Sequence, residues 1–206
     1  MGFLCIPSKV IHSTWYNFYM SITRIDNIFS QKEIDHMLKI ISEGDSHIDA
    51  RYGRLRVSDL EHGLLPETIE KFNNIVKNIS TLPLKMGSVM SVDYSPLYGE
   101  PHLPPHFDGD SNDLIINIQL DSNTFWDIGL NLETYRLNDN CALIFNANEE
   151  VHWRVHKRFK EGEHVLMVFA RFFNEENLSD YSHLSVPDDK ILKAPTDFRN
   201  SLGIFD

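Results

Sequence analysis

The stretch Pro105-His106-Phe107-Asp108 is followed, after a short polar segment, by the apolar run Leu114-Ile115-Ile116-Asn117-Ile118-Gln119-Leu120. The run is rich in β-branched residues and predicts a buried strand. In the first stretch, His106 and Asp108 are separated by one residue. On an extended strand they project from the same face, because successive side chains alternate sides. The two stretches together predict a β-sheet fold that carries a paired imidazole and carboxylate.

A second histidine, in Val151-His152-Trp153, lies 46 residues beyond His106 (152 − 106). If it projects from a strand across a barrel, its imidazole completes a triangle with His106 and Asp108. One carboxylate and two histidines form the facial triad of non-haem Fe(II) sites, which leaves coordination positions open. Open positions let reactants reach the metal. We therefore predict an enzyme in which His106, Asp108 and His152 are the metal ligands and the catalytic residues.

The chain contains a second pair with the same spacing, His47-Ile48-Asp49. It follows the polar stretch Ser42-Glu43-Gly44-Asp45-Ser46, which is typical of the end of a helix. No histidine on a predicted strand lies at a useful distance from this pair. We therefore place the metal at the His106 pair.

Composition restricts the classes of protein that fit. The 206 residues are 42% hydrophobic, which suits one domain over residues 1–206. Cys5 and Cys141 are the only cysteines, so we expect no disulfide framework and a cytoplasmic location. No apolar run is long enough to span a bilayer, and no signal peptide is recognisable. The net charge of −11 argues against nucleic acid as a partner. No particular oligomeric state is predicted.

Helical patterns come first along the chain, and strand patterns follow. After an opening strand over Ile22–Phe29, Ser30 and Glu33 form a capping box that begins a helix. A second helix is predicted over Pro66–Ile79. Period-two patterns then predict strands at Ser88–Tyr94, Leu114–Leu120, Ala142–Phe145, Val151–Phe159 and His164–Phe173. This order predicts an α+β fold whose antiparallel sheet closes into a barrel or jelly roll.

These features resemble the Fe(II)/2-oxoglutarate-dependent oxygenases, in particular the prolyl-4-hydroxylase-like branch. The resemblance covers roughly Ile22 to Phe173. It rests on the opening strand and helix, a tyrosine before the metal pair, the His-x-Asp, the distal histidine, and the turn and strand of Gly162–Phe169. It implies a double-stranded β-helix core, a distorted jelly roll buttressed by N-terminal helices. An irregular tail, residues 174–206, would follow this core.

The resemblance also implies the chemistry. His106, Asp108 and His152 would ligate Fe(II), and 2-oxoglutarate would chelate two of the open positions as co-substrate. Ascorbate would be an additional cofactor. The reaction would release succinate and CO₂ and hydroxylate a C–H bond. Halogenating relatives have Gly or Ala in place of the carboxylate, so Asp108 favours hydroxylation.

The chain departs from the family at the residue that binds the distal carboxylate of 2-oxoglutarate. Family members place Arg or Lys immediately after the position of Glu163, where this chain has His164. If Val151–Phe159 is one strand, other basic residues share the face of His152 or follow closely. They are Arg154, His156, Arg158 and Lys160. We predict that Arg154, Arg158 or His164 binds this carboxylate.

Two further residues are candidates for the proximal carboxylate of 2-oxoglutarate, namely Tyr94 and Asn117, whose side chains can donate hydrogen bonds. Arg171 is a weaker candidate for the distal carboxylate. It lies seven residues beyond His164, about 23 Å along a strand.

His156 is the main rival to His152 as the third metal ligand. Val151 before His152 matches the apolar-His pattern of the family, which favours His152. In a helix, His152 and His156 would lie one turn apart, as in a zinc protease. The glutamate that such a motif needs is replaced by Trp153, and the surrounding residues prefer a strand.

We therefore predict an Fe(II)- and 2-oxoglutarate-dependent dioxygenase that hydroxylates an amino acid, a peptidyl residue or a similar small polar substrate. The substrate would enter between the loop Tyr98–Pro105 and the segment Thr124–Tyr135, where Phe125 and Trp126 could form apolar walls. One alternative is a cupin-like metal-dependent dioxygenase or isomerase that does not use 2-oxoglutarate. Another is a non-catalytic jelly-roll binding module.

Overall fold

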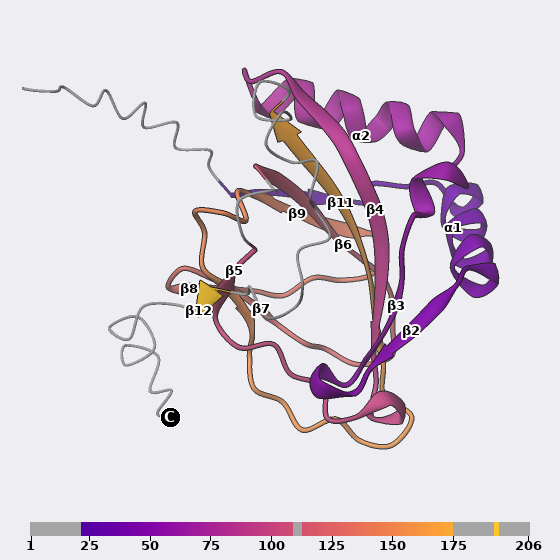
Figure 1. Ribbon diagram of the computed structural model, residues 1–206, viewed down its shortest axis with the longest axis vertical. Coiled ribbons are helices and arrows are strands. Elements are labelled where there is room, and N and C mark those ends of the chain that lie inside the picture. Colours follow the sequence, from indigo (N-terminus) through magenta and orange to yellow (C-terminus); the bar gives the residue numbers. More distant parts are fainter. Residues whose placement is uncertain (1–21, 109–112, 175–191, 194–206) are drawn as a thin grey trace, which may run out of the picture.

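The computed structural model describes residues 22–108, 113–174 and 192–193, which form two facing β-sheets with two helices against the larger sheet (Figure 1). The larger sheet has the order β1 (Thr23–Asp26), β9 (Cys141–Phe145), β6 (Leu114–Ser122), β11 (Val165–Asn174), β4 (Leu84–Tyr94), β3 (Arg54–Val57) and β2 (Ser46–Asp49). The smaller sheet has the order β12 (Leu192–Lys193), β5 (His106–Phe107), β10 (His152–Arg154), β7 (Ile128–Leu130) and β8 (Glu133–Tyr135). All strand pairs are antiparallel. This arrangement confirms the predicted α+β jelly roll.

The two helices are α1 (Gln31–Glu43) and α2 (Pro66–Ile79). In Figure 1 they lie on the side of the larger sheet that faces away from the smaller one. In the described ranges, short 3₁₀ helices lie in the connections between these elements, namely η1 (Ala50–Tyr52), η2 (Leu60–His62) and η3 (Pro96–Tyr98). Helix α1 begins directly after Ser30 of the predicted capping box, and helix α2 begins at Pro66, as the sequence predicted.

Strand alternation divides the apolar residues between two cores. On β6, Leu114, Ile116 and Ile118 pack toward the helices, in the cluster that contains Phe72 of α2. Ile115 points to the other side and belongs to the cluster between the two sheets. Asn117 has the same parity as Ile115, so its buried amide lies between the sheets. The barrel interior therefore contains polar side chains among apolar ones.

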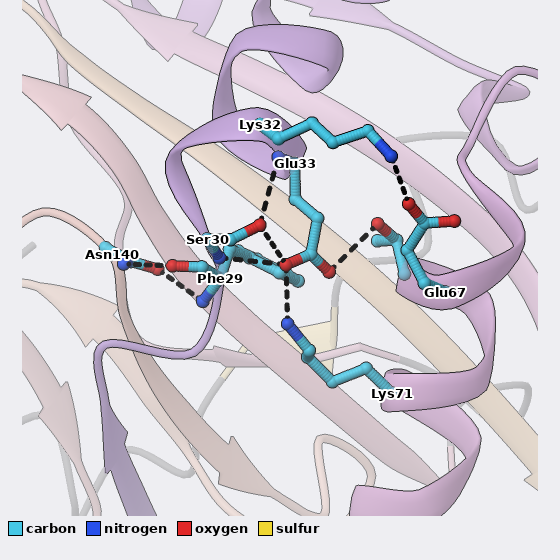
Figure 2. Close-up of polar contacts among 8 residues, drawn as sticks. Phe29, Ser30, Lys32, Glu33, Glu67, Lys71 and Asn140 are labelled. Atoms are coloured by element: carbon cyan, nitrogen blue, oxygen red, sulfur yellow. Dashed lines mark hydrogen bonds and ion pairs between the residues drawn. The ribbon is translucent and has the colours of Figure 1, made fainter.

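A buried polar cluster joins α1 to α2 and to β9 (Figure 2). Glu33 is 4% exposed and accepts hydrogen bonds from the Ser30 backbone at 2.8 Å and from Lys71 Nζ at 2.6 Å. Thr68 donates a third, at 3.2 Å. Burial acts to raise the pKa of Glu33, but Lys71 and Ser30 outweigh it and lower the pKa to about 2. Asn140 pairs with the backbone of Phe29 in both directions and ties this helix start to the sheet.

One predicted strand is shorter than expected. The expected strand Val151–Phe159 ends at Arg154, because β7, its partner in the smaller sheet, has only three residues. Beyond Arg154, the Val155 amide donates to the backbone carbonyl of Asp127. Phe159 packs in the core, with its ring centroid 5.0 Å from that of Trp126. The strands β2, β3, β7 and β8 were not predicted, because each has only three or four residues.

No helix in the described ranges is long and apolar enough to cross a membrane. The predicted irregular tail lies outside the described residues, apart from Asn174, Leu192 and Lys193. The proposed single domain and its limits therefore stay predictions.

We predict that Glu33→Gln lowers the free energy of unfolding by about 2–3 kcal/mol at pH 7, because the low pKa of Glu33 reflects stabilisation of its charged form. A carboxylate with a depressed pKa stabilises the fold above its unfolded pKa. The difference between parent and variant should therefore shrink as the pH falls from about 5 toward about 2. Urea unfolding at several pH values measures this.

The matched control is Glu67→Gln, which removes the partner of Lys32 on the surface of the same cluster (Figure 2). Both side chains of that pair are largely exposed, so stability should not change measurably. Equal losses for the two variants would contradict the role given to Glu33.

Candidate metal centre

His106, Asp108 and His152 converge on one point between the two sheets. Their ligand atoms all lie within 4.8 Å of one another, the single such group among the described residues. Asp108 Oδ1 lies 3.5 Å from His106 Nε2 and 3.4 Å from His152 Nε2. The two imidazole ring centroids are 4.1 Å apart. This spacing suits three ligands around one ion.

The two histidines lie on neighbouring strands and not on strands across a barrel, as the sequence had suggested. His152 of β10 is the direct partner of His106 of β5. Asp108 follows β5, and its amide bonds to the Ala147 carbonyl at 2.9 Å. Adjacent strands bring opposite side chains within about 5 Å of each other, so the register alone places both imidazoles at the site.

Backbone carbonyls fix the orientation of both imidazole rings. His106 Nδ1 lies 2.8 Å from the Pro104 oxygen, and His152 Nδ1 lies 3.1 Å from the Glu150 oxygen. A carbonyl can only accept, so Nδ1 donates in each contact, which leaves each Nε2 as the ring atom that can bind a metal. Hydrogen bonds of this kind orient histidines that bind metals.

Trp153 fixes the direction of the side chains on β10. Since side chains alternate along a strand, Trp153 projects to the face opposite His152 and Arg154. Its ring lies over Gly129 of β7, where an added Cβ would come within 2.0 Å of it. A glycine at position 129 is therefore needed for this packing, which keeps His152 directed inward.

The protonation states of the group suit a divalent cation. Burial acts to raise the pKa of Asp108, but His152, His106 and Arg171 hold it well below its usual range. Burial, and then the neighbouring His152, lower the pKa of His106. An anionic oxygen ligand and neutral imidazoles are the donors preferred by iron of the facial-triad class. The residues therefore fit the predicted metal.

Arg154 is a second charged group in the barrel interior. It is 5% exposed and lies two residues beyond His152, about 6.6 Å along the strand and on the same face. Its guanidinium donates to the Trp126 carbonyl at 2.7 Å and lies 3.2 Å from Met167 Sδ. In the described part of the chain, no carboxylate forms an ion pair with it. Burial lowers the pKa of Arg154 to about 10, so it remains a cation at neutral pH.

The other basic candidates do not share the site. His156 and Arg158 lie beyond the end of β10 and are exposed. His164 precedes β11 and its Nε2 lies 3.4 Å from Asp121 Oδ2, on the outer side of the larger sheet. His156 and Arg158 lie outside the site because β10 ends before them. His164 lies outside it because side chains alternate along a strand. The structure brings only Arg154 of the three predicted residues into the interior with the triad.

Tyr94 and Asn117 both project into the space between the sheets. Tyr94 is 1% exposed, with its ring at 4.9 Å from Trp126 in an edge-to-face arrangement. Asn117 is 3% exposed, and its Oδ1 has no hydrogen-bond partner among the residues that the structure describes. An unpaired buried amide oxygen costs free energy unless a ligand or water completes it.

The walls of the site differ in part from the sequence prediction. Trp126 is core, since it packs between Tyr94 and Phe159, whereas Phe125 is 60% exposed. Phe145 of β9 lies 5.2 Å from the His152 ring.

Arg171 of β11 is close enough to Asp108 to lower its pKa. Distance along the strand had made Arg171 a weak candidate, and no local signal in the sequence places it near the metal ligands.

Comparison with known proteins supports the fold. No family model and no curated protein sequence matches the chain. Solved structures do match. The epimerase SnoN, in complex with Fe3+, alpha ketoglutarate and nogalamycin RO, has a TM-score of 0.60 at 10% identity, covering 85% of this chain and 91% of SnoN.

Two prolyl hydroxylases are also similar. The viral collagen prolyl hydroxylase of Paramecium Bursaria Chlorella virus-1, in its 2OG complex, has a TM-score of 0.56 at 12% identity, covering 74% of this chain and 95% of that one. A prolyl hydroxylase from Trichoplax adhaerens, bound to a hypoxia inducible factor peptide, has a TM-score of 0.57 at 13% identity, covering 79% and 87%. The chain therefore has the fold of the Fe/2-oxoglutarate-dependent oxygenases.

We predict that Asp108→Ala weakens Fe(II) binding, because it removes the only anionic residue of the predicted triad. Loss of a residue that merely orients a metal ligand typically costs roughly 10- to 100-fold in affinity, and loss of Asp108 itself should cost more. His152→Ala should have a comparable effect. Anaerobic titration with Fe(II) measures both.

His47→Ala is the control, because His47 belongs to the other His-x-Asp pair and lies exposed on β2. It should bind Fe(II) like the parent. Normal binding by Asp108→Ala together with loss in His47→Ala would mean that the metal lies at the other pair.

Proposed function

We propose that this protein is an Fe(II)- and 2-oxoglutarate-dependent dioxygenase that hydroxylates an amino acid, a peptidyl residue or a similar small polar molecule. The observation that carries the proposal is the convergence of His106, Asp108 and His152 in the interior of a jelly roll of this fold. Bound iron and 2-oxoglutarate together would supply the oxidising chemistry that hydroxylates the substrate and releases succinate and CO₂. The residues of the chain would bind, orient and enclose these groups.

Charge balance supports 2-oxoglutarate as the co-substrate. A divalent iron with the Asp108 carboxylate leaves one net positive charge, and Arg154 adds a second. A buried cation without a counter-ion is unfavourable, so this interior favours a dianion. Arg154 lies about 6.6 Å along the strand from His152, a separation suited to a short dicarboxylate with one end at the metal. We therefore assign the distal carboxylate to Arg154.

Arg154 would take the role that relatives give to a basic residue on the last strand. It belongs to β10, yet its guanidinium reaches Met167 of β11. Arg154 thus lies next to β11, which corresponds to the strand from which relatives provide the basic residue that binds the distal carboxylate. Arg158 and His164, the other predicted binders, are farther from the interior and are not part of this proposal.

Tyr94 and Asn117 would complete the co-substrate site. Each is almost completely buried, and each can donate a hydrogen bond from the barrel interior. The Asn117 Nδ2 group would donate to the carboxylate, since Oδ1, unpaired among the described residues, can only accept. Because Tyr94 and Arg154 both contact Trp126, we assign Tyr94 to the distal carboxylate and not to the proximal one expected from the sequence. Asn117 remains the candidate for the proximal carboxylate.

Two observations support the proposed substrate class, namely the net charge of the chain and the ligands of the similar structures. The net charge of −11 opposes a polyanion at long range. Among the similar structures, one acts on collagen prolyl residues by its name, one holds a peptide and one holds nogalamycin RO. These ligands are peptides or small molecules. The same comparison does not favour the cupin-like alternative or the non-catalytic binding module.

We predict that Arg154→Gln weakens 2-oxoglutarate binding to the iron-loaded protein by roughly one to two decades. The reason is the loss of a charge-assisted contact that contributes about 1.5–3 kcal/mol. Isothermal titration under anaerobic conditions measures this, and Fe(II) affinity should remain at the parent level.

Arg158→Gln is the matched control, because it removes the same charge from the exposed segment after β10. It should bind 2-oxoglutarate like the parent. A strong loss in Arg158→Gln with none in Arg154→Gln would reassign the clamp, whereas no binding by the parent would overturn the proposed function.

We also predict that a free amino acid or a proline-containing peptide, and not an oligonucleotide, increases succinate formation by the iron-loaded protein. A panel of these compounds, assayed for substrate-dependent succinate, tests the substrate class. Stimulation by oligonucleotides alone would contradict it.

A further inference from the structure

We propose that Arg54, a residue outside the triad and the Arg154 clamp, is a positioning residue for the co-substrate. It orients the Tyr94 hydroxyl so that the hydroxyl proton points to the distal carboxylate held by Arg154. The inference rests on the proposed function, since it concerns the same co-substrate. It adds β3, a strand of the larger sheet from which no residue of the proposed site has so far come, to the binding of 2-oxoglutarate.

Arg54 is held firmly on its own side. It is 7% exposed, and two of its guanidinium nitrogens lie 2.8 and 2.6 Å from Asp49 Oδ2. The guanidinium carbon also lies 4.5 Å from the Tyr52 ring centroid. A buried arginine paired through two nitrogens and stacked on an aromatic ring has few alternative positions. Asp49 and Tyr52 therefore fix where Arg54 can donate its remaining hydrogen bonds.

The remaining donors of Arg54 reach Tyr94. The two residues are direct partners in the pairing of β3 with β4, so both side chains lie on the same face of the sheet. Burial acts to lower the pKa of Arg54, but a hydrogen bond with Tyr94 and the pairing with Asp49 raise it above its usual value. A guanidinium can only donate, so the Tyr94 oxygen accepts.

This hydrogen bond determines what the Tyr94 hydroxyl can do next. With its oxygen accepting from Arg54, the hydroxyl keeps one proton to donate. Tyr94 packs edge-to-face on Trp126, and the Arg154 guanidinium lies over the same ring at 5.2 Å. Arg54, opposite Tyr94 on β3, and Arg154, over Trp126, therefore both lie close to the Tyr94 side chain. A carboxylate bound to Arg154 is the acceptor that this proton would meet.

The ion pair with Asp49 also keeps the charge of this region suited to one carboxylate. Without Asp49, Arg54 would be a second buried cation without a paired carboxylate close to Tyr94. Asp49 neutralises Arg54, so Arg154 remains as the cation available to the ligand. This gives a role to the second His-x-Asp pair of the sequence, in which Asp49 serves an arginine and not a metal.

A double-mutant cycle tests the inference through 2-oxoglutarate affinity, measured by calorimetry on iron-loaded protein without turnover. Arg54→Met and Tyr94→Phe should each weaken binding roughly 3- to 10-fold, the effect of one hydrogen bond. If Arg54 acts through Tyr94, the double variant should bind no more weakly than Tyr94→Phe alone. Fe(II) affinity should be unchanged throughout.

Two further variants protect the test against simple misfolding. Arg54→Lys keeps a charge beside Asp49 but lacks the planar fork that can serve Asp49 and Tyr94 together, so it should fold like the parent and still bind 2-oxoglutarate more weakly. Arg56→Gln is the control, because Arg56 lies two residues away on the same face of β3, opposite Val92. It should bind 2-oxoglutarate like the parent, and thermal unfolding verifies the fold of each variant.

The possible results separate the two claims. Additive losses in the double variant, or parent-like affinity in both Arg54 variants, would overturn the role of Arg54 and leave the proposed function standing. Absence of 2-oxoglutarate binding in the parent itself would overturn the proposed function and the inference with it.

Discussion

The pairing of β5 with β10 is the constraint on which the candidate site depends. It places His152 directly opposite His106, so one strand register provides two of the three predicted metal ligands. A slip of one residue would turn His152 and Arg154 out of the barrel and Trp153 into it. The contact of Trp153 with Gly129 opposes this slip, because only a glycine leaves room for the indole. A predicted metal ligand, the residue proposed to bind the distal carboxylate and a packing contact thus share a strand of three residues.

The interior of the barrel is organised by charge as well as by shape. Asp108 is held anionic between two imidazoles, and Arg154 is a buried cation with no carboxylate partner in the described ranges. Such an arrangement is costly in a protein without ligands, since buried charges normally require partners. It is favourable in one that binds a divalent metal and a dicarboxylate. The same reasoning separates Arg54, which Asp49 neutralises, from Arg154. The two arginines lie close to Tyr94 and have different proposed roles.

Much of the fold could be predicted from the sequence, because its signals are local. The capping box of Ser30 and Glu33 and the alternation on β6 and β11 each depend on residues close together in the chain. The short strands β2, β3, β7 and β8 could not be predicted, since they are stable only as partners of other strands. The end of β10 was misplaced for the same reason: its length is set by β7 and not by its own residues. The spacing and context of His106, Asp108 and His152 identified the triad, whereas the choice of Arg154 over Arg158 and His164 needed the end of β10 and the parity of β11. Arg54 and Arg171 reach the interior through pairing across the sheet, which no sequence pattern records.

The most direct test of this account is an anaerobic optical titration of the Fe(II)-loaded protein with 2-oxoglutarate. Bidentate chelation of iron by the keto acid produces a metal-to-ligand charge-transfer band. The account predicts that the band appears on titration of the parent and is absent in Asp108→Ala. Iron binding at the triad without such a band, together with no 2-oxoglutarate binding by calorimetry, would contradict the central claim that this jelly roll holds metal and co-substrate together.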